Sequence, residues 1–343
     1  MTFDADKDLK GMSLAELEQL SVGLAQKKYI AKYIFSFIHN KTAEEISQIS
    51  PLSKAFRNQL IDDGYYISNL RIVEKLVDAD GTVKYLFELF DKNTVEAVVL
   101  SDGKRKTVCV STQVGCAVNC QFCATGKLKF KRNLTVGEIL DQVYIAGRDN
   151  GRISNVVYMG MGEPMYNYDN VIKSVKLLID PAGQNFAIRH LTISTCGIGE
   201  GILKLADEDI RPRLAVSLNA AFDSIRTKLM PINKSYSLSE LLKALRVYQL
   251  RTKQRVTIEY VLLKDVNDSD ADAEALARIL KSIKCNVNLI GYNAHPGSKF
   301  QASTKAPDFA SILTRAGIET IIRAKMGAKI KAACGQLGAD KLK

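Results

Sequence analysis

The most informative stretch of the 343-residue chain is Cys116-Ala117-Val118-Asn119-Cys120-Gln121-Phe122-Cys123, in which three cysteines stand within eight residues. Three thiolates on one short loop can hold three irons of a [4Fe–4S] cluster, whereas clusters that only transfer electrons normally have four cysteine ligands. The missing fourth ligand would leave one iron open to a small molecule that binds through nitrogen and oxygen. The stretch therefore predicts an iron–sulfur site with an open coordination position.

A zinc site is the alternative interpretation, with Cys109 as the fourth ligand. Structural zinc sites favour pairs of cysteines two to four residues apart, with a longer segment between the pairs. Here the steps along the chain are seven, four and three residues, and no second pair follows. The spacing favours iron–sulfur, and a non-catalytic four-cysteine zinc protein that binds RNA stays open as an alternative.

The cysteines and the first residues also bear on the compartment. Seven cysteines are an odd number, and four of them cluster between residues 109 and 123, which is not typical of a disulfide framework. The start, MTFDADKDLK, has no apolar core of a secretory signal, and no apolar run approaches the roughly 18 residues that span a bilayer. We therefore expect a cytoplasmic protein with no membrane contact.

The pattern of strands and helices divides the chain at about residue 95. Residues 1–95 combine short helical patterns with two strand-like runs, 70–77 and 83–90, joined by the turn Asp80-Gly81. These residues predict a small N-terminal accessory domain. Residues 96–343 alternate strands with helices, which is typical of a parallel sheet with right-handed crossovers. The expected strands are Thr107–Thr112, Asn155–Met159, His190–Thr195, Arg213–Leu218, Arg255–Leu262, Asn286–Tyr292 and Glu319–Arg323.

The number of strand–helix units and the helix starts refine this prediction. Six or seven units fall short of the eight of a closed barrel, so we expect an open, partial α/β barrel with its site at the carboxyl ends of the strands. Its lateral opening would suit a bulky substrate. Sequences of the capping-box type predict four helix starts, at Ser13–Glu16, Thr42–Glu45, Thr135–Glu138 and Ser237–Glu240.

The formal charge of +11 is distributed unevenly along the chain. Residues 1–90 carry 11 basic and 13 acidic side chains, so the remaining residues hold a net +13. Between residues 101 and 132, seven basic side chains and one acidic side chain bracket the cysteine stretch. Such a run is often only a solvated surface, but beside a metal site it indicates the binding of a phosphate backbone.

The run Cys-x3-Cys-x-Phe-Cys resembles the motif of radical S-adenosylmethionine (SAM) enzymes. Over nearly the whole chain the sequence resembles, more narrowly, the RlmN/Cfr family of radical SAM RNA methyltransferases. The stretches that carry this resemblance are Val108–Cys116, Gly160-Met161-Gly162-Glu163-Pro164 and Ala333-Cys334-Gly335-Gln336-Leu337. The resemblance implies that Cys116, Cys120 and Cys123 bind a [4Fe–4S] cluster whose open iron binds SAM. It further implies that the N-terminal accessory domain, residues 1–95, contacts RNA.

The resemblance also implies contacts to SAM at the ends of several strands. Many family members have histidine where this chain has Asn219, and asparagine can likewise donate and accept hydrogen bonds. Glu163 would accept hydrogen bonds from the SAM amino group. The implied SAM contacts are Gly162, Glu163, Ser194, Ser217, Leu218, Asn219 and Asn293.

Three further residues acquire catalytic roles from the resemblance. Cys334 takes a methyl group from one SAM, and a second SAM is cleaved to a 5′-deoxyadenosyl radical that removes hydrogen from this methyl group. The methylene radical adds to a carbon of adenine, which tethers the protein to RNA. Glu96 then removes a proton, and Cys109 attacks the sulfur of Cys334, which releases methyladenosine and leaves a Cys109–Cys334 disulfide. Cys196 and Cys285 match no motif and are interpreted as structural.

The implied substrates are an adenosine of 23S ribosomal RNA, methylated at C2, and transfer RNA. Cfr-type methylation at C8 of the same kind of site is the nearest alternative, because the motifs are common to both activities. A radical SAM enzyme acting on a small molecule is a third, which the net +13 beyond residue 90 disfavours. We also expect a flavodoxin-like electron donor, a thiol reductant that reopens the disulfide, and a monomeric enzyme.

Overall fold

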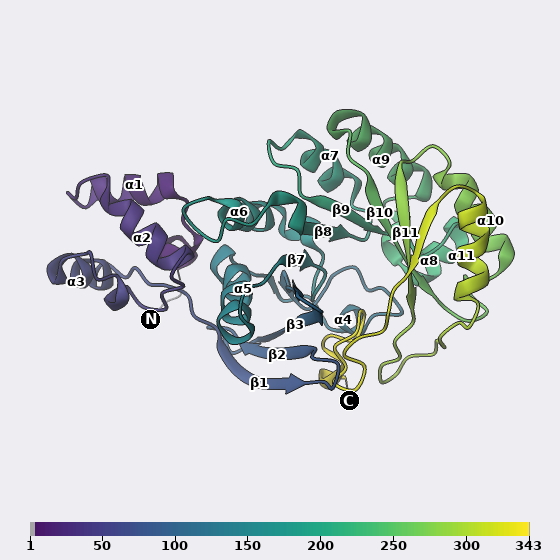
Figure 1. Cartoon of the computed structure of the whole chain (residues 1–343), viewed down its shortest axis with the longest axis horizontal. Helices are drawn as coiled ribbons and strands as arrows, with labels where there is room; N and C mark the ends of the chain where they lie inside the picture. Colours follow the sequence, from purple (N-terminus) through teal and green to yellow (C-terminus); the bar gives the residue numbers. More distant parts are fainter. Residues whose placement is uncertain (1–3, 343) are drawn as a thin grey trace.

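The computed structural model describes residues 4–342, which form an N-terminal group of helices followed by a large sheet with helices packed around it (Figure 1). The N-terminal helices are α1 (Leu14–Gly23), α2 (Ile30–His39) and α3 (Lys54–Asp62). The Ser13–Glu16 capping box predicted for the first of them is present, with both reciprocal hydrogen bonds. In α2, the side chains of Ile34 and Ile38 face the core, as their helical spacing predicts.

A ten-stranded sheet runs through the described residues in the order β1-β2-β3-β4-β7-β8-β9-β10-β11-β12. Its first four strands are antiparallel neighbours. They are β1 (Arg71–Val77), β2 (Val83–Glu88), β3 (Thr94–Asp102) and β4 (Arg105–Cys109). The sheet is thus continuous from the predicted hairpin into the barrel, and β3 crosses residue 95. The division of the chain into residues 1–95 and 96–343 remains a prediction.

From β4 onward, neighbouring strands of this sheet are parallel, which confirms the predicted open barrel. These strands are β7 (Asn155–Tyr158), β8 (Leu191–Thr195), β9 (Arg213–Ser217), β10 (Val256–Leu262), β11 (Cys285–Gly291) and β12 (Glu319–Ile322). β12 pairs with β11 and not with β1, so the sheet does not close. A separate two-stranded ribbon is formed by β5 (Gln113–Val114) and β6 (Arg132–Asn133).

The crossover helices lie on the outer side of the sheet (Figure 1). They are α5 (Val136–Asn150), α6 (Tyr168–Ile179), α7 (Gly199–Asp207), α8 (Asp223–Leu229), α9 (Leu238–Thr252), α10 (Asp270–Leu280) and α11 (Ala306–Arg315), and the short α4 (Ala124–Lys127) follows the cysteine stretch. The predicted capping boxes Thr135–Glu138 and Ser237–Glu240 begin α5 and α9. None of the helices formed by residues 4–342 is long and apolar enough to cross a membrane.

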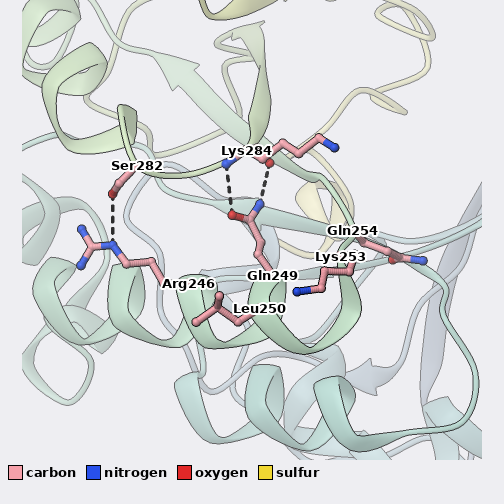
Figure 2. Close-up of a pocket in the computed structure, with 7 residues that line it drawn as sticks. All are labelled: Arg246, Gln249, Leu250, Lys253, Gln254, Ser282 and Lys284. Carbon is pink, nitrogen blue, oxygen red and sulfur yellow. Dashed lines mark hydrogen bonds between the residues drawn. The ribbon is translucent and has the colours of Figure 1, made fainter.

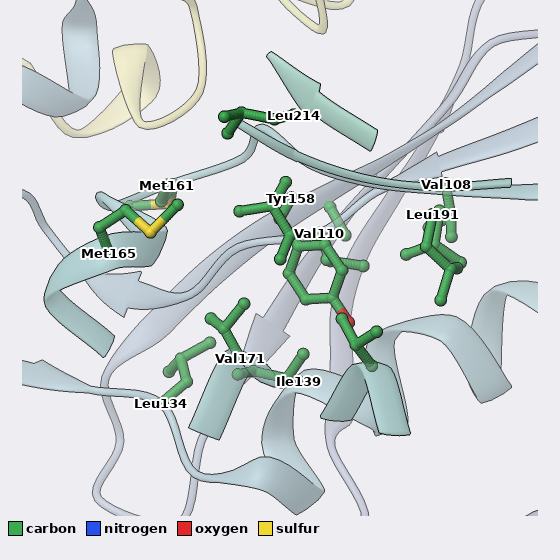
Figure 3. Packing of buried hydrophobic residues seen from close by; sticks show 14 of the residues in the cluster. Val108, Val110, Leu134, Ile139, Tyr158, Met161, Met165, Val171, Leu191 and Leu214 are labelled. Carbon is green, nitrogen blue, oxygen red and sulfur yellow. The ribbon is translucent and has the colours of Figure 1, made fainter. Parts of the chain in front are cut away.

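The two faces of the parallel strands differ in polarity. The outer face carries Val108, Tyr158, Leu191 and Leu214, which are buried under the helices. Figure 3 shows the ring of Tyr158 among Val110, Ile139 and Val171, so β7, α5 and α6 share one apolar core. Because successive side chains of a strand alternate between faces, the other set of side chains points into the barrel lumen. Many of these are polar, which suits a binding site better than a packed interior.

The N-terminal helices are held to the barrel through a buried ion pair. Lys10 and Asp141 of α5 are both fully buried, with 2.5 Å between Nζ and Oδ1. Lys10 also donates to the carbonyl of Ser68, and the other oxygen of Asp141 accepts the amide of Leu70 at 2.5 Å. A buried ion pair whose other polar atoms are also bonded resists separation. The Lys10–Asp141 pair therefore fixes the N-terminal part of the chain on α5.

One predicted helix start is wrong. Thr42 has φ of +53°, whereas an N-cap residue requires extended backbone. Glu45 and Gln48 instead cap a single 3₁₀ turn, Ile46–Gln48, and Pro51 follows. The next helix is α3, and its N-cap is Ser53.

Candidate active site

Strand register places two of the predicted catalytic residues on the same face of the sheet. Val98 of β3 lies opposite Cys109 of β4, and directly opposed residues point to the same face. Glu96, two residues before Val98, therefore shares this face with Cys109. Farther along the same face, Cys109 lies opposite Val157, and Val157 lies opposite Thr192. This is the lumen side, away from the helices.

The cysteine stretch lies between β5 and α4 and is attached to distant parts of the chain. The amide of Gln121 donates to the carbonyl of Leu229 at 2.8 Å, and the amide of Ala124 donates to the carbonyl of Gly335 at 2.8 Å. The hydroxyl of Thr125 donates to the carbonyl of Leu337 at 2.7 Å. The stretch is therefore bonded directly to the segment that carries Cys334.

The thiols of this stretch are desolvated and close enough to act on one another. Burial raises the pKa of Cys116 to about 12, and it also raises the pKa of Cys120 and of Cys123. The charges of the other two thiols raise the pKa of Cys120 further. Among residues 4–342, no three Cys, His, Asp or Glu side chains are arranged to hold a single metal ion. In an iron–sulfur cluster each cysteine instead binds a separate iron. Three soft, neighbouring thiols are the donor set that an iron–sulfur cluster takes.

Glu163 follows β7 and is held by backbone groups. Its Oε2 accepts the amide of Cys196 at 2.7 Å, and its Oε1 accepts the amide of Met165 at 3.1 Å. Burial raises the pKa of this carboxyl, and these hydrogen bonds oppose the shift. Gly162 has φ of +101°, and an added Cβ would lie 2.5 Å from Cβ of Gln113. The Gly162-Glu163 turn thus packs tightly against the loop before the cysteines.

The other predicted SAM contacts lie at or beyond the carboxyl ends of barrel strands. Ser194 is on the lumen face of β8, paired with Ala215, and Ser217 is two residues further along β9 on the same face. Ser217 lies opposite Glu259 of β10. Asn293 follows β11, and its amide group donates to the carbonyl of Cys334 at 3.2 Å. These residues line the same end of the barrel as the cysteine stretch.

Asn219 has a structural task that explains an asparagine here. Its φ is +59°, a left-handed conformation that asparagine tolerates better than most residues. Its Oδ1 accepts the amide of Val261 at 2.9 Å, and its own carbonyl accepts a hydrogen bond from Asn267 at 2.7 Å. Leu218, just before it, is fully buried and donates its amide to the carbonyl of Glu259 at 3.0 Å.

Cys109 and Cys334 are 225 positions apart in sequence yet are electrostatic neighbours. Burial raises the pKa of Cys109 to about 12, and the nearby Cys334 raises it further. Solvent reaches Cys334 although protein surrounds it on most sides, which raises its pKa to about 11 while Arg323 opposes the shift. The charge of Arg323 lowers the pKa of both thiols, and Cys109 faces the lumen by strand register.

The sequence patterns did not reveal three polar residues of this lumen, which are Glu259, Asn288 and Arg323. Glu259 is buried and accepts a hydrogen bond from Asn288 at 2.9 Å, and its Oε2 lies 3.8 Å from Arg323. No hydrogen bond to this Oε2 is made by the part of the chain that the structure describes. Strand register is the only signal that could have found these residues. By contrast, Cys285 lies at the amino end of β11, and its interpretation as a structural residue stays a prediction.

An open surface pocket of about 540 Å³ lies away from these residues, at the amino ends of β10 and β11 (Figure 2). In it, Arg246 of α9 donates to Ser282 at 3.1 Å, and Gln249 exchanges two hydrogen bonds with the backbone of Lys284. None of the predicted site residues lines this pocket. The predicted site residues therefore lie away from this pocket, at the other end of the barrel.

Two family models match the chain. The ribosomal RNA large subunit methyltransferase N-terminal domain matches residues 7–64, and the radical SAM superfamily matches residues 110–277. A solved radical SAM methyltransferase from Sphaerobacter thermophilus superposes with a TM-score of 0.92 at 42% identity, covering 97% of this chain and 99% of that one.

Curated relatives match at similar identity over nearly their whole length. A probable dual-specificity RNA methyltransferase RlmN from Thermotoga neapolitana is 45% identical, covering 96% of this chain and 97% of the relative. The dual-specificity RNA methyltransferase RlmN from Geotalea uraniireducens is 43% identical over 96% of each chain. The chain therefore belongs to the RlmN family of RNA methyltransferases, which are radical SAM enzymes.

Proposed function

We propose that this enzyme methylates C2 of an adenosine in 23S ribosomal RNA and in transfer RNA, through a methylated Cys334 and a Cys109–Cys334 disulfide. The observation that carries the proposal is the attachment of the segment around Cys334 to this site: the amide of Gly338 donates to Glu96 at 3.1 Å, and the carbonyl of Gly335 accepts the amide of Ala124 at 2.8 Å. Cys109 lies on the same sheet face as Glu96. A methyl carrier and a resolving thiol must approach within bonding distance, and these contacts support such an approach.

The cysteine stretch is the proposed seat of the cluster, with Cys116, Cys120 and Cys123 as ligands. When bound, a [4Fe–4S] cluster supplies the electron that cleaves SAM to a 5′-deoxyadenosyl radical. Gly162, Glu163, Ser194, Ser217, Leu218, Asn219 and Asn293 are the proposed SAM contacts. The two oxygens of Glu163 already accept backbone amides, and each oxygen has a second lone pair for an ammonium group.

The chain's own residues account for methyl transfer in three steps. Cys334 is accessible, so its sulfur can take a methyl group from one SAM and later approach the base. Glu96 Oε1 accepts no hydrogen bond from the described residues, which leaves it available for the proton that the adenine carbon must lose. Cys109 is half-buried on the same face, and its thiolate attacks the sulfur of Cys334. The bond from this sulfur to the methylene carbon breaks, the released carbon takes up a proton, and the unpaired electron of the adduct would return to the cluster. A thiol reductant then reopens the disulfide.

Family membership decides between the alternatives that the sequence leaves open. The named relatives are RlmN enzymes, which favours C2 over the C8 position of Cfr-type enzymes. Their names also specify RNA, so a small-molecule substrate is not proposed. A non-catalytic zinc protein is excluded, because the chain belongs to a family of methyltransferases.

Exposed basic side chains beside the cysteine stretch are the proposed contacts to RNA phosphates. Lys127, Lys129 and Lys131 are exposed, and none pairs with a carboxylate among residues 4–342. Phe130 between them is 43% exposed and offers a surface on which a base can stack. We further propose a cytoplasmic, monomeric enzyme that receives electrons from a flavodoxin-like donor.

The trapped adduct is the sharpest test of this function. Cys109→Ala, incubated anaerobically with SAM, reductant and RNA, should accumulate a covalent protein–RNA species that nuclease digestion and mass spectrometry locate on Cys334. Cys334→Ala should form neither adduct nor product. Cys285→Ala is the matched control and should turn over normally. Normal turnover by Cys109→Ala would show that Cys109 does not resolve the adduct.

A further inference from the structure

Lys84 is a buried lysine that belongs to none of the predicted sites. It connects the sheet to the C-terminal stretch that carries Cys334, residues 327–340, which we call the Cys334 segment. The side chain of Lys84 on β2 is only 3% exposed. Its Nζ lies 2.9 Å from Oδ2 of Asp340 and 4.0 Å from Oε2 of Glu96. A lysine is rarely buried unless it is paired, because removing its charge from water is costly. Lys84 therefore bridges a carboxylate of the sheet and a carboxylate near the C-terminus.

The position of Lys84 follows from strand register. Lys84 lies opposite Val98, which in turn lies opposite Cys109. These three residues form a row across β2, β3 and β4 on the lumen face, and Glu96 stands next to this row on β3. Lys84 is thus part of the surface that presents Glu96 and Cys109.

Besides its bonds to the cysteine stretch and to Asn293, the Cys334 segment is attached at two further points, one at the β1–β2 turn and one at β2 and β3. Before Cys334, the carboxylates of Asp80 and Asp78 accept the amides of Gly327 at 2.8 Å and Lys329 at 3.1 Å. After Cys334, the amide of Gly338 donates to Oε2 of Glu96 at 3.1 Å, and Asp340 pairs with Lys84. In Figure 1 the C-terminal segment, in yellow, lies beside the end of the β1–β2 hairpin. Of these two attachments, only the one after Cys334 involves a residue with a predicted catalytic role, Glu96.

We propose that Lys84 is a positioning residue that holds the Cys334 segment against Glu96, so that the methyl-carrying sulfur and the base keep a fixed separation. The proposal rests on the functions proposed above for Glu96 and Cys334. Without the ammonium of Lys84, the carboxylates of Glu96 and Asp340 repel each other. Residues 338–340 then move away from β3, and the adduct on Cys334 loses its alignment with Oε1 of Glu96.

The surroundings of Glu96 explain why a cation is needed there. Burial raises the pKa of Glu96, while Lys84, the amide of Gly338 and Lys341 favour the ionised form and Asp340 disfavours it. A base must be ionised to take a proton. Lys341 donates to the carbonyl of Thr94 at 2.7 Å and cannot replace the contact to Asp340 without breaking that bond.

Hydrogen–deuterium exchange of the protein without cofactors tests the positioning directly. Lys84→Met keeps the length of the side chain and removes its charge. We expect the amide of Gly338 to exchange at least tenfold faster in this variant, while the amides of Gly327 and Lys329 stay protected. Lys331→Met is the matched control, because Lys331 pairs with the same Asp340 at 2.5 Å but is 48% exposed. Lys84→Arg should restore protection.

The reconstituted enzyme gives an independent readout. In Lys84→Met we expect methylation of Cys334 to proceed and release of RNA to slow at least tenfold, so that the protein–RNA adduct accumulates. If Lys84→Met folds poorly, Asp340→Asn provides a second test, because Asp340 is 44% exposed and its replacement also removes the ion pair with Lys84. The amide of Gly338 should then exchange faster in Asp340→Asn as well. Unchanged exchange at Gly338 together with normal release would refute the positioning role. Absence of methylated Cys334 in the unmodified enzyme would instead refute the proposed function, and the exchange result would stand.

Discussion

The amide of Gly338 donates to the carboxylate of Glu96 at 3.1 Å, although 242 positions separate the two residues. This bond joins the strand that precedes the barrel to the segment that follows it. Cys334 lies four residues before Gly338, so this bond attaches the segment that carries Cys334 to the strand that carries Glu96. The proposed reaction, which passes a methyl group from Cys334 to RNA and a proton to Glu96, needs both residues in one place.

Removing the charge of Lys10 should destabilise the fold. Lys10→Met leaves the buried carboxyl group of Asp141 without its partner, which costs about 3–5 kcal/mol of unfolding free energy. Urea denaturation of the protein without cofactors measures the loss. The double variant Lys10→Met/Asp141→Asn removes both charges and should recover most of it. Equal stability of the single variant and the unmodified protein would show that the ion pair does not hold the N-terminal helices.

His39 should make the protein less stable in mild acid. Burial, with the charge of Lys10, lowers the pKa of His39 from 6.5 to about 3, and its Nδ1 is bonded to the hydroxyl of Tyr144 at 2.7 Å. Between these pH values the unfolded chain binds a proton that the folded chain does not. Stability is therefore lost as the pH falls below 6.5, by about 2 kcal/mol at pH 5. His39→Gln should flatten this part of the pH–stability curve, and a curve of unchanged slope would contradict the assignment.

Glu259 should have the opposite pH dependence. Burial raises its pKa above 4.5, although Arg323 and Asn288 oppose the shift, so the folded chain holds a proton that the unfolded chain has lost. This group then costs stability as the pH rises above 4.5, and the cost is complete above the raised pKa. Glu259→Gln should gain stability relative to the unmodified protein at pH 7.5 but not at pH 4. Glu319→Gln, at an exposed pair with Arg255, is the control.

The lysines beside the cysteine stretch should set the salt dependence of RNA binding. Replacing Lys127, Lys129 and Lys131 with glutamine should weaken binding and lower the slope of log affinity against log salt by about 0.7 to 0.9 for each RNA phosphate that is no longer neutralised. Lys253→Gln and Lys284→Gln, in the pocket at the opposite end of the barrel (Figure 2), provide a control in which positive charge is removed far from the cysteines. If RNA binding weakened equally in the control variant, RNA would be attracted non-specifically by the positive charge of the whole chain.

Sequence patterns predicted the barrel because its signals are local. The seven expected barrel strands lie within a few residues of the observed ones, since apolar alternation marks each strand separately. Ser13, Thr135 and Ser237 cap helices as predicted, because a capping box needs only four consecutive residues. The helix start predicted at Thr42 is wrong for a local reason as well, because the backbone of Thr42 is left-handed.

Other features depend on register between strands and were not predictable from one sequence. Lys84 and Glu259 look like ordinary strand residues until pairing places them beside Val98 and Ser217. The approach of Cys334 to Cys109 was expected only from the family resemblance, because no pattern links residues so far apart.

Analysis of the RNA product tests the central claim most directly. Ribosomal and transfer RNA lacking the modification should be incubated separately with reconstituted enzyme, reductant and SAM carrying a deuterated methyl group. After digestion to nucleosides, mass spectrometry against authentic standards identifies the methylated position. We predict 2-methyladenosine that retains two of the three deuterium atoms from both RNAs, because the methyl group passes through a methylene on Cys334. A product at C8, a fully deuterated methyl group or no methylated adenosine would contradict the account.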